Sequence, residues 1–329
     1  MPSIQSPQSA MRRPRSLPAR FKRQRVLIIG CGDVGQRVVR LWQGAGASRL
    51  PLVRALTSSL DKRAALRAQG ITPLLGNLDD ARSLRRLAGL GQRVVHLAPP
   101  AAIAEGAAAA RDLRTQRLLR VLALGLQMPT LVYGSTTGVY GDCQGQWVDE
   151  TWPLRASTAR ALRRVDAEAQ LRQWARRFVA SAARVHVLRI PGIYAGDREG
   201  GTPVARLQRG TPVLRREDDV YTSHIHADDL ARAVALALWR GKPQRSSNVS
   251  DDSSLRMGDY FDLAADLWQL PRPARVSRAE AEQLLSPMLL SFMSESRRLR
   301  NQRMQKELGL RLRYPTVHEG LAAALALRR

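Results

Sequence analysis

Three glycines with the spacing Gly-x-Gly-x-x-Gly stand between an apolar run and a helical pattern near the start of the chain. The run covers 26–29, the glycines are Gly30, Gly32 and Gly35, and apolar residues recur at helical spacing from Val38 onward. In a strand–turn–helix unit these glycines permit the tight turn, let backbone N–H groups approach a pyrophosphate and let the helix pack on the strand. The helix N-terminus adds partial positive charge. The spacing predicts a dinucleotide site, and the alternative is a plain strand-to-helix turn.

Further strands are expected at 52–56, 71–75, 93–97, 130–133 and 185–190, and helical segments alternate with them. This alternation predicts an α/β fold, a Rossmann-type doubly wound parallel sheet. Ligands bind at the carboxyl edge of such a sheet, so residues in the bend and at the following strand ends are predicted to contact the cofactor. They are Gly30, Cys31, Gly32, Asp33, Val34, Gly35, Thr57, Ser58, Asn77, Leu78, Leu97, Ala98 and Pro99.

The end of the second expected strand bears on the choice between NAD and NADP. In NAD-selective sites a carboxylate at this place takes the ribose 2′-hydroxyl. Here the strand is followed by the hydroxyl residues 57–59, with Lys62 and Arg63 close behind. A site without a carboxylate and with cations nearby favours NADP over NAD. The alternative is that Lys62 and Arg63 only face solvent on the next helix.

Composition limits the class of protein. The chain has 329 residues, of which 44% are hydrophobic, and no apolar run is long enough to span a membrane. Its two cysteines, Cys31 and Cys143, are too few for a disulfide framework or a metal site. We therefore expect a soluble, cytoplasmic protein without a metal.

The net charge of +25 raises the question of nucleic-acid binding. The basic residues are almost all arginine and are dispersed along every expected helix, and the chain has only four Phe. Because basic residues do not alternate with aromatic residues that stack on bases, specific binding to nucleic acid is not expected.

Three later motifs accompany the glycine bend. They are Ser-Thr-Thr-Gly-Val-Tyr-Gly at 135–141, Leu-Arg-Ile-Pro-Gly-Ile-Tyr at 188–194 and Ile-His-Ala-Asp-Asp-Leu at 225–230. With these motifs in this order, the chain from Arg25 onward resembles the extended short-chain dehydrogenase/reductase superfamily, of the NAD-dependent epimerase/dehydratase type. The resemblance implies an NAD(P)-binding oxidoreductase or epimerase that acts on a small hydroxyl or carbonyl compound, with a nucleotide-sugar as the natural candidate.

The resemblance also implies roles for individual residues. Thr136 matches the hydroxyl residue that hydrogen-bonds the reacting carbonyl or alcohol, as a group that both donates and accepts can do. Pro191 and Ile193 match the loop beside the nicotinamide. A turn that closes a strand is the alternative role for Thr136.

The family's acid/base pair, Tyr-x-x-x-Lys, is missing from the expected position. Aligning on Glu168 places Arg160 at the tyrosine position and Arg164 at the lysine position. A guanidinium stays protonated, so neither can exchange a proton, although Arg164 can hold ribose hydroxyls or a phosphate.

Three explanations remain open. Another residue supplies the proton, with Tyr140, Tyr194 and His226 as candidates, and we take Tyr140 together with Thr136 as the predicted catalytic residues. Alternatively, the reaction needs no such acid. Thirdly, the protein is a non-catalytic dinucleotide sensor that works through a partner, and an RNA-associated role ranks below these.

The expected domain plan has a disordered basic tail at 1–24 and an NAD(P)-binding domain at 25–190, to which 226–242 return. The substrate-binding region is expected at 191–225 and 243–329. A homodimer is a further expectation, and long helices are expected near 105–124 and 297–308. Arginines in or around the expected cleft indicate an anionic substrate if they converge, whereas solvated side chains are the alternative; they are Arg189, Arg198, Arg206, Arg215, Arg297 and Arg298.

Overall fold

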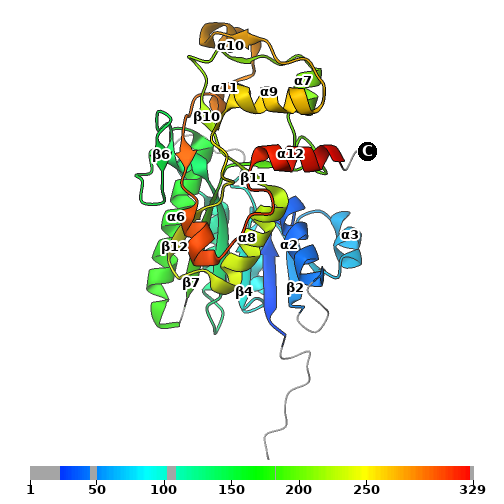
Figure 1. The fold of residues 1–329 in the computed structure, drawn as a ribbon. Coiled ribbons are helices and arrows are strands. Elements are labelled where there is room, and N and C mark those ends of the chain that lie inside the picture. Colours follow the sequence, from blue (N-terminus) through cyan, green and yellow to red (C-terminus); the bar gives the residue numbers. More distant parts are fainter. Residues whose placement is uncertain (1–22, 45–49, 102–108, 182, 327–329) are drawn as a thin grey trace, which may run out of the picture.

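The computed structural model describes residues 23–44, 50–101, 109–181 and 183–326 (Figure 1). Most of the predicted tail, 1–24, lies outside these ranges. In the described part, no helix has both the length and the apolar character needed to cross a membrane.

The centre is a sheet of seven strands in the order β12-β7-β5-β4-β1-β2-β3, and every neighbouring pair is parallel. Its apolar strands are buried on both faces, as all-parallel sheets require. The predicted α/β, Rossmann-type parallel sheet is confirmed. The strands are β1 (Arg25–Ile29), β2 (Leu52–Thr57), β3 (Thr72–Leu75), β4 (Arg93–His96), β5 (Thr130–Thr136), β7 (Arg184–Ile190) and β12 (Arg245–Asn248).

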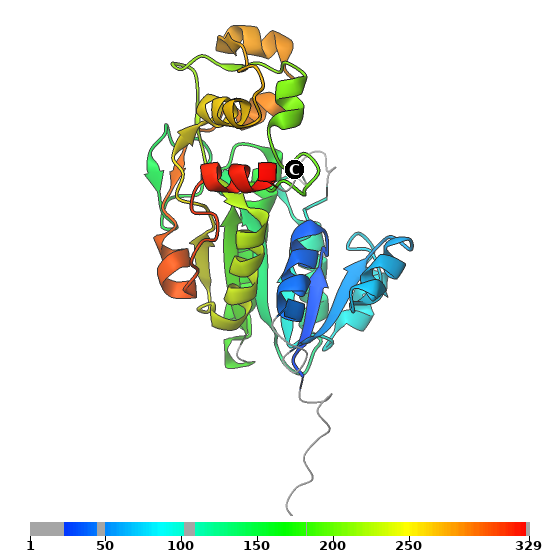
Figure 2. The same cartoon turned by 45° about the vertical axis from the view of Figure 1, so that its right-hand side comes forward.

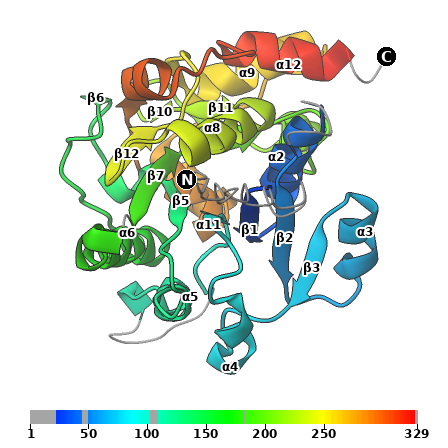
Figure 3. The same cartoon turned by 90° about the horizontal axis from the view of Figure 1, so that it is seen from below.

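Helices cover both faces of the sheet, as Figure 3 shows from below. On one face α2 (Asp33–Gly44), α3 (Lys62–Ala68) and α8 (Ala227–Arg240) bury one core cluster. On the other, α4 (Ala81–Leu84), η2 (Arg85–Leu87), α5 (Leu113–Leu122) and α6 (Ala159–Arg177) bury a second. Because the order of strands reverses between β1 and β4, a crevice opens at their carboxyl ends.

A further group of elements lies beyond one end of the sheet and has its own apolar core (Figures 1 and 2). Its helices are α7 (Val204–Gln208), α9 (Met257–Leu267), α10 (Arg278–Leu284), α11 (Pro287–Phe292) and α12 (Val317–Ala326). Its short strand pairs join β8 (Gly192–Tyr194) to β11 (His224–His226), β9 (Val213–Leu214) to β14 (Arg275–Val276), and β10 (Tyr221–Thr222) to β13 (Leu255–Arg256).

Two expected helices differ from the structure. Of 105–124, residues 105–108 lie outside the described ranges, and α5 begins only at Leu113, because the Asp112 side chain caps it by accepting from the Thr115 amide. In the segment 297–308, β15 (Arg298–Leu299) instead pairs with β6 (Trp147–Val148). Helical structure remains there only from residue 302, with 302–303 leading into the π-helical turn η6 (Met304–Leu308), which Gly309 follows in the left-handed conformation.

The segment after 243 also contributes to the main sheet and its core. β12 pairs with β7 as the edge strand of the sheet, and Met304 and Leu308 are buried with the α8 core. The division of the chain at 243 stays a prediction.

Candidate functional site

A cleft of about 450 Å³ runs along the carboxyl edge of the sheet, between the ends of β1, β4, β5 and β7, the start of α6, and α11. We call the part at β1 and α2 the bend end, and the part at α6 and α11 the α6 end. Ten of the predicted site residues line it, namely Gly30, Gly32, Asp33, Val34, Gly35, Leu97, Thr136, Arg164, Pro191 and Ile193.

The glycine bend has the shape that a pyrophosphate needs. A Cβ on Gly30 would lie 2.4 Å from the backbone nitrogen of Ala98, so only glycine fits there. A Cβ on Gly32, by contrast, would meet no atom within 4 Å. The Gly32 side of the bend therefore faces open space in front of the first turn of α2, whose amides lack partners within the helix.

Carboxylates neutralise the arginines at the bend end. Arg37, only 5% exposed, binds Asp33 at 2.9 Å, Asp197 at 2.6 Å and Asp228 at 2.5 Å. Burial alone would lower the pKa of Arg37, but these three carboxylates raise it above its ordinary value. Arg198 adds a bond to Asp33 at 2.9 Å, so three carboxylates surround two arginines here.

At the end of β5, two neighbouring hydroxyls have different surroundings. The Thr136 hydroxyl accepts from the Gly138 amide at 3.3 Å and lines the cleft, so its proton is available to a ligand. The Ser135 hydroxyl is buried and donates to Glu168 at 2.7 Å. Glu168 in turn accepts from Arg189 at 2.9 Å, so a buried ion pair fixes the strand end behind Thr136.

The structure corrects the prediction that Tyr140 takes part in catalysis. Its ring is fully buried, and its hydroxyl donates to Asn248 at 2.7 Å and accepts from Arg189 at 2.9 Å. Burial raises the pKa of Tyr140 to about 12 although Arg189 opposes this. The two alternative proton donors are also buried away from the cleft lining: Tyr194 donates to the Thr316 carbonyl, and His226 caps α8.

The two α6 arginines line the cleft from one face of the helix. Arg164 donates from Nη1 to the Tyr133 hydroxyl at 2.9 Å and to the Gly134 carbonyl at 2.7 Å. Burial raises the pKa of Tyr133, so the hydroxyl stays neutral. Arg160 is exposed, and its guanidinium lies 4.9 Å from the centre of the Phe292 ring. Both arginines therefore contact neutral groups.

The opposite wall of the α6 end comes from α11 and the segment after it, of which the sequence indicated only Arg297. Phe292, Glu295 and Arg297 line the cleft there. Arg297 donates to Glu295 at 2.7 Å, and Glu295 also accepts from Ser157 at 3.4 Å. No motif marks these residues, because they reach the cleft only through the folding of the C-terminal segment.

The other predicted cofactor contacts do not line this cleft. Cys31 is half-buried behind the bend, and burial raises the pKa of its thiol to about 11. The Asn77 side chain accepts from the Asp79 amide in its own turn. The remaining ones sit at the carboxyl ends of β2, β3 and β4, beside the bend end, and are Thr57, Ser58, Leu78, Ala98 and Pro99.

Of the two alternatives for the six arginines around the expected cleft, convergence on a substrate or solvated side chains, the structure does not show convergence of all six. Only Arg198 and Arg297 line the cleft. Arg189 is buried with Glu168, Arg215 pairs with Glu280, and the other two lie over aromatic rings, Arg206 on Phe261 and Arg298 on Trp147. Among the described residues, no cluster of three or more His, Cys, Asp or Glu side chains could hold a metal ion.

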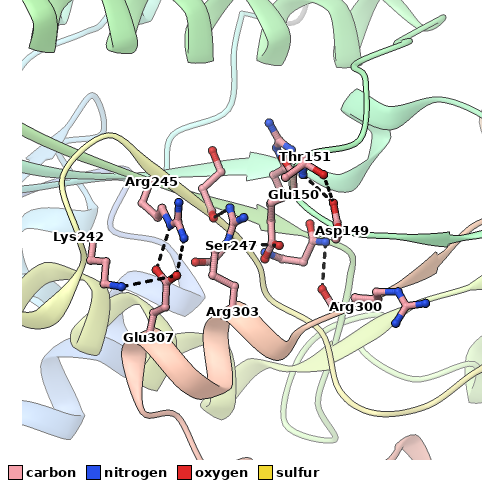
Figure 4. A network of polar contacts seen from close by, with 12 residues as sticks. Asp149, Glu150, Thr151, Lys242, Arg245, Ser247, Arg300, Arg303 and Glu307 are labelled. Carbon is pink, nitrogen blue, oxygen red and sulfur yellow. Dashed lines mark hydrogen bonds and ion pairs between the residues drawn. The ribbon is translucent and has the colours of Figure 1, made fainter.

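A second polar network supports the sheet edge at β12 (Figure 4). Glu307 accepts from Arg245 at 3.0 Å and lies 3.7 Å from Lys242, and Arg303 lies 3.6 Å from Glu150. Glu150 and Glu307 thus each have a cation, whereas Asp149 accepts from the Thr151 amide at 2.8 Å. The network is structural and ties η6 and the loop at 149–151 to the sheet.

Comparisons with known proteins show which family this chain is similar to. The model of the NAD dependent epimerase/dehydratase family matches residues 26–250. No curated protein matches the chain.

Several solved structures are similar over nearly their whole length. One is a functionally unknown conserved protein from Silicibacter pomeroyi DSS, with 30% identity, a TM-score of 0.70 and coverage of 92% of this chain and 99% of that one. A putative epimerase from Burkholderia cenocepacia J2315 has 17% identity, a TM-score of 0.72 and coverage of 93% and 98%. The dTDP-glucose 4,6-dehydratase DesIV from Streptomyces venezuelae, as a double mutant, has 21% identity, a TM-score of 0.72 and coverage of 92% and 96%.

Proposed function

This chain belongs to the NAD dependent epimerase/dehydratase family, and we propose that it is an NAD(P)-dependent oxidoreductase or epimerase-like enzyme. The substrate is a small hydroxyl or carbonyl compound of anionic character, with a nucleotide-sugar as the leading candidate. The DesIV structure holds NAD, and a second similar structure, MoeE5, holds UDP-glucose and NAD, which supports this proposal.

The observation that carries the proposal is the continuous cleft from Gly32 to Thr136. It joins an open, amide-lined bend to a hydroxyl whose proton is free to bind a ligand oxygen. A dinucleotide bound with its pyrophosphate at the bend would extend toward Thr136 across β4, the strand between β1 and β5.

In this proposal the bound NAD(P) supplies or accepts the hydride, and the residues of the chain bind and orient. Thr136 donates to the substrate oxygen, Pro191 and Ile193 form the wall beside it, and Arg164 holds a ribose hydroxyl or phosphate. Arg160 and Arg164 replace the family's Tyr and Lys, so the proton must come from elsewhere. Glu295 is the carboxyl group lining the α6 end, and we propose it as the group that exchanges this proton, directly or through water.

The preference for NADP over NAD belongs to the proposal. The end of β2 carries hydroxyl residues at 57–59, and the Thr57 hydroxyl already accepts from the Ser59 amide at 3.2 Å. Lys62 and Arg63 begin α3 immediately after this turn. A 2′-phosphate at 57–59 would thus meet hydroxyl groups, with Lys62 and Arg63 following the N-cap residue Asp61.

The test is fluorescence titration of the purified protein with NADH and NADPH. We expect both to bind, NADPH more tightly. Gly32→Leu should abolish binding and leave the thermal unfolding temperature unchanged, because its side chain enters open space. The control is Gly44→Leu, at the far end of α2, where a Cβ also has free space and the backbone is not left-handed. The absence of binding of either cofactor to the natural chain would refute the proposal.

Turnover is tested next, by incubating the protein with NAD, NADP and a panel of nucleotide-sugars. Cofactor binding without turnover of any of them would favour the dinucleotide-sensor alternative. We retain the cytoplasm and a homodimer as predictions, and light scattering of the purified protein tests the second.

A further inference from the structure

The charges of the two cleft ends differ. At the bend end Arg37 and Arg198 meet Asp33, Asp197 and Asp228. At the α6 end three guanidinium groups line the cleft and one carboxylate opposes them. They are Arg160, Arg164 and Arg297, with Glu295 as the acid.

Arg164 is held in place by groups that cannot neutralise it. Its two acceptors, the Tyr133 hydroxyl and the Gly134 carbonyl, both bond Nη1. Within the described residues its other N–H groups have no hydrogen-bond partner, and no carboxylate lies within ion-pair distance of it. Nη1 of the guanidinium thus anchors the side chain to β5, and the N–H groups of Nη2 and Nε are left to bind a ligand.

Arg160 lies one helical turn earlier on the same face of α6. Its guanidinium lies over the Phe292 ring of the α11 wall, 4.9 Å from the ring centre, and this cation–π contact orients it. In the part of the chain that the structure describes, no carboxylate pairs with it. Two arginines on one helix face, both oriented by neutral neighbours and both lining the cleft, form a fork for a group with two or more charged oxygens.

We propose that the α6 end is an oxyanion site, in which Arg160 and Arg164 bind a carboxylate or phosphate of the substrate next to the carbon that reacts. This rests on the proposed function, because it assigns the pyrophosphate of the cofactor to the bend end. The substrate class is then a hydroxy or oxo acid, or a phosphorylated alcohol or ketone, and the nucleotide-sugar of the proposed function belongs to it where its sugar carries such an acid group. Thr136 binds the oxygen that reacts, and both arginines bind the acid group, Arg164 in addition to the cofactor ribose that the proposed function assigns to it.

The test uses calorimetric titration of the NADPH-loaded protein with three probes: malonate, inorganic phosphate and the neutral malonamide. Malonate stands for a carboxylate substrate and phosphate for a phosphorylated one. We expect one of the two anions to bind and malonamide not to bind. Loss of one charge-assisted contact in Arg160→Gln should weaken that anion about tenfold, with NADPH affinity unchanged. Arg160→Lys should recover part of the loss.

The matched control is Arg176→Gln, which removes the same charge from an exposed place in the last turn of α6. It should leave anion binding unchanged, so an equal loss there would show general charge attraction and overturn the site. Failure of both anions to bind the natural protein would also overturn it.

The same titrations without cofactor keep the two proposals apart. If NADPH does not bind but an anion binds in an Arg160-dependent way, the proposed function fails and the oxyanion site stands. If NADPH binds and displaces the anion, the arginines serve the phosphates of the cofactor and the substrate site is refuted.

Discussion

At the bend end of the cleft, Arg37 is buried and paired with acids, whereas Arg160 and Arg164 at the α6 end contact an aromatic ring, a phenol and a backbone carbonyl. The first arrangement is complete without a ligand, because carboxylates already satisfy each guanidinium. The second leaves uncompensated charge facing a cavity. The difference indicates that pairing at the bend end stabilises the fold, while unpaired charge at the α6 end is available for binding.

The largest effect on stability is expected from breaking the most buried arginine ion pair, that of Arg189 with Glu168. Glu168→Gln leaves Arg189 charged and buried without its acid, and should lower the free energy of unfolding by about 3–5 kcal/mol. Chemical denaturation followed by circular dichroism measures this. Glu282→Gln, on the exposed surface of α10, is the control. A loss as small as that of the control would mean that paired arginine is not what stabilises this fold.

Arg37→Gln should have the next largest effect. It leaves Asp33, Asp197 and Asp228 without their shared cation, which should cost about 2–3 kcal/mol of stability. It should also weaken NAD(P) about tenfold, because the Asp33 carboxylate then repels the pyrophosphate. Arg40→Gln on the exposed side of α2 should change neither quantity. If Arg37→Gln leaves the free energy of unfolding unchanged, ion pairs at the bend end do not stabilise the fold, and the contrast between the two cleft ends fails.

Arg164→Ala concerns the unpaired end, and should affect ligands more than the fold. We expect NAD(P) affinity to fall about tenfold, since a ribose hydroxyl or phosphate loses a charged donor. The stability change should stay below about 1 kcal/mol, because no buried acid is left unpaired. Fluorescence titration and thermal unfolding measure the two quantities. An unchanged affinity would rule out a cofactor role for Arg164 and assign it to the substrate alone.

Asp251 is the converse case, and its effect depends on pH: it is a buried acid for which no ion pair with an arginine is found among the described residues. Its Oδ1 accepts from the Ser253 amide, while Oδ2 has no partner. Burial raises its pKa from 3.8 to about 8. The native state thus keeps a proton that the unfolded chain releases, so this contribution to stability is complete below about pH 4 and is lost as the pH rises to about 8.

Asp251→Asn should therefore match the natural chain at pH 4 and become increasingly more stable than it as the pH rises to about 8, by about 1.4 kcal/mol per pH unit. Thermal unfolding across this pH range is the measurement, with the exposed Asp61→Asn as the control. If the two curves stay parallel from pH 4 to pH 8, Asp251 is not a protonated buried acid.

The sequence by itself determined the features that depend on neighbouring residues. The glycine bend was predictable because its three glycines act within one turn, where they allow the tight turn, the approach of a phosphate and the packing of the helix. The parallel sheet was predictable because strands and helices have distinct hydrophobic periodicities. The position of Arg160 and Arg164 on one helix face followed from their spacing of four residues. The position of Thr136 at the cleft was also predictable, because it ends a strand and ligands bind at the carboxyl ends of the strands.

Only the tertiary structure decided which arginines are neutralised and which are not. Arg37 meets Asp197 and Asp228 across 160 and 191 positions of sequence, and no local pattern selects these acids among the 28 in the chain. Tyr140 belongs to the same motif as Thr136 but is buried in the core, where its hydroxyl donates to Asn248 and accepts from Arg189. Local rules set backbone geometry, whereas the partner of a charge or a hydroxyl depends on which distant elements pack against it.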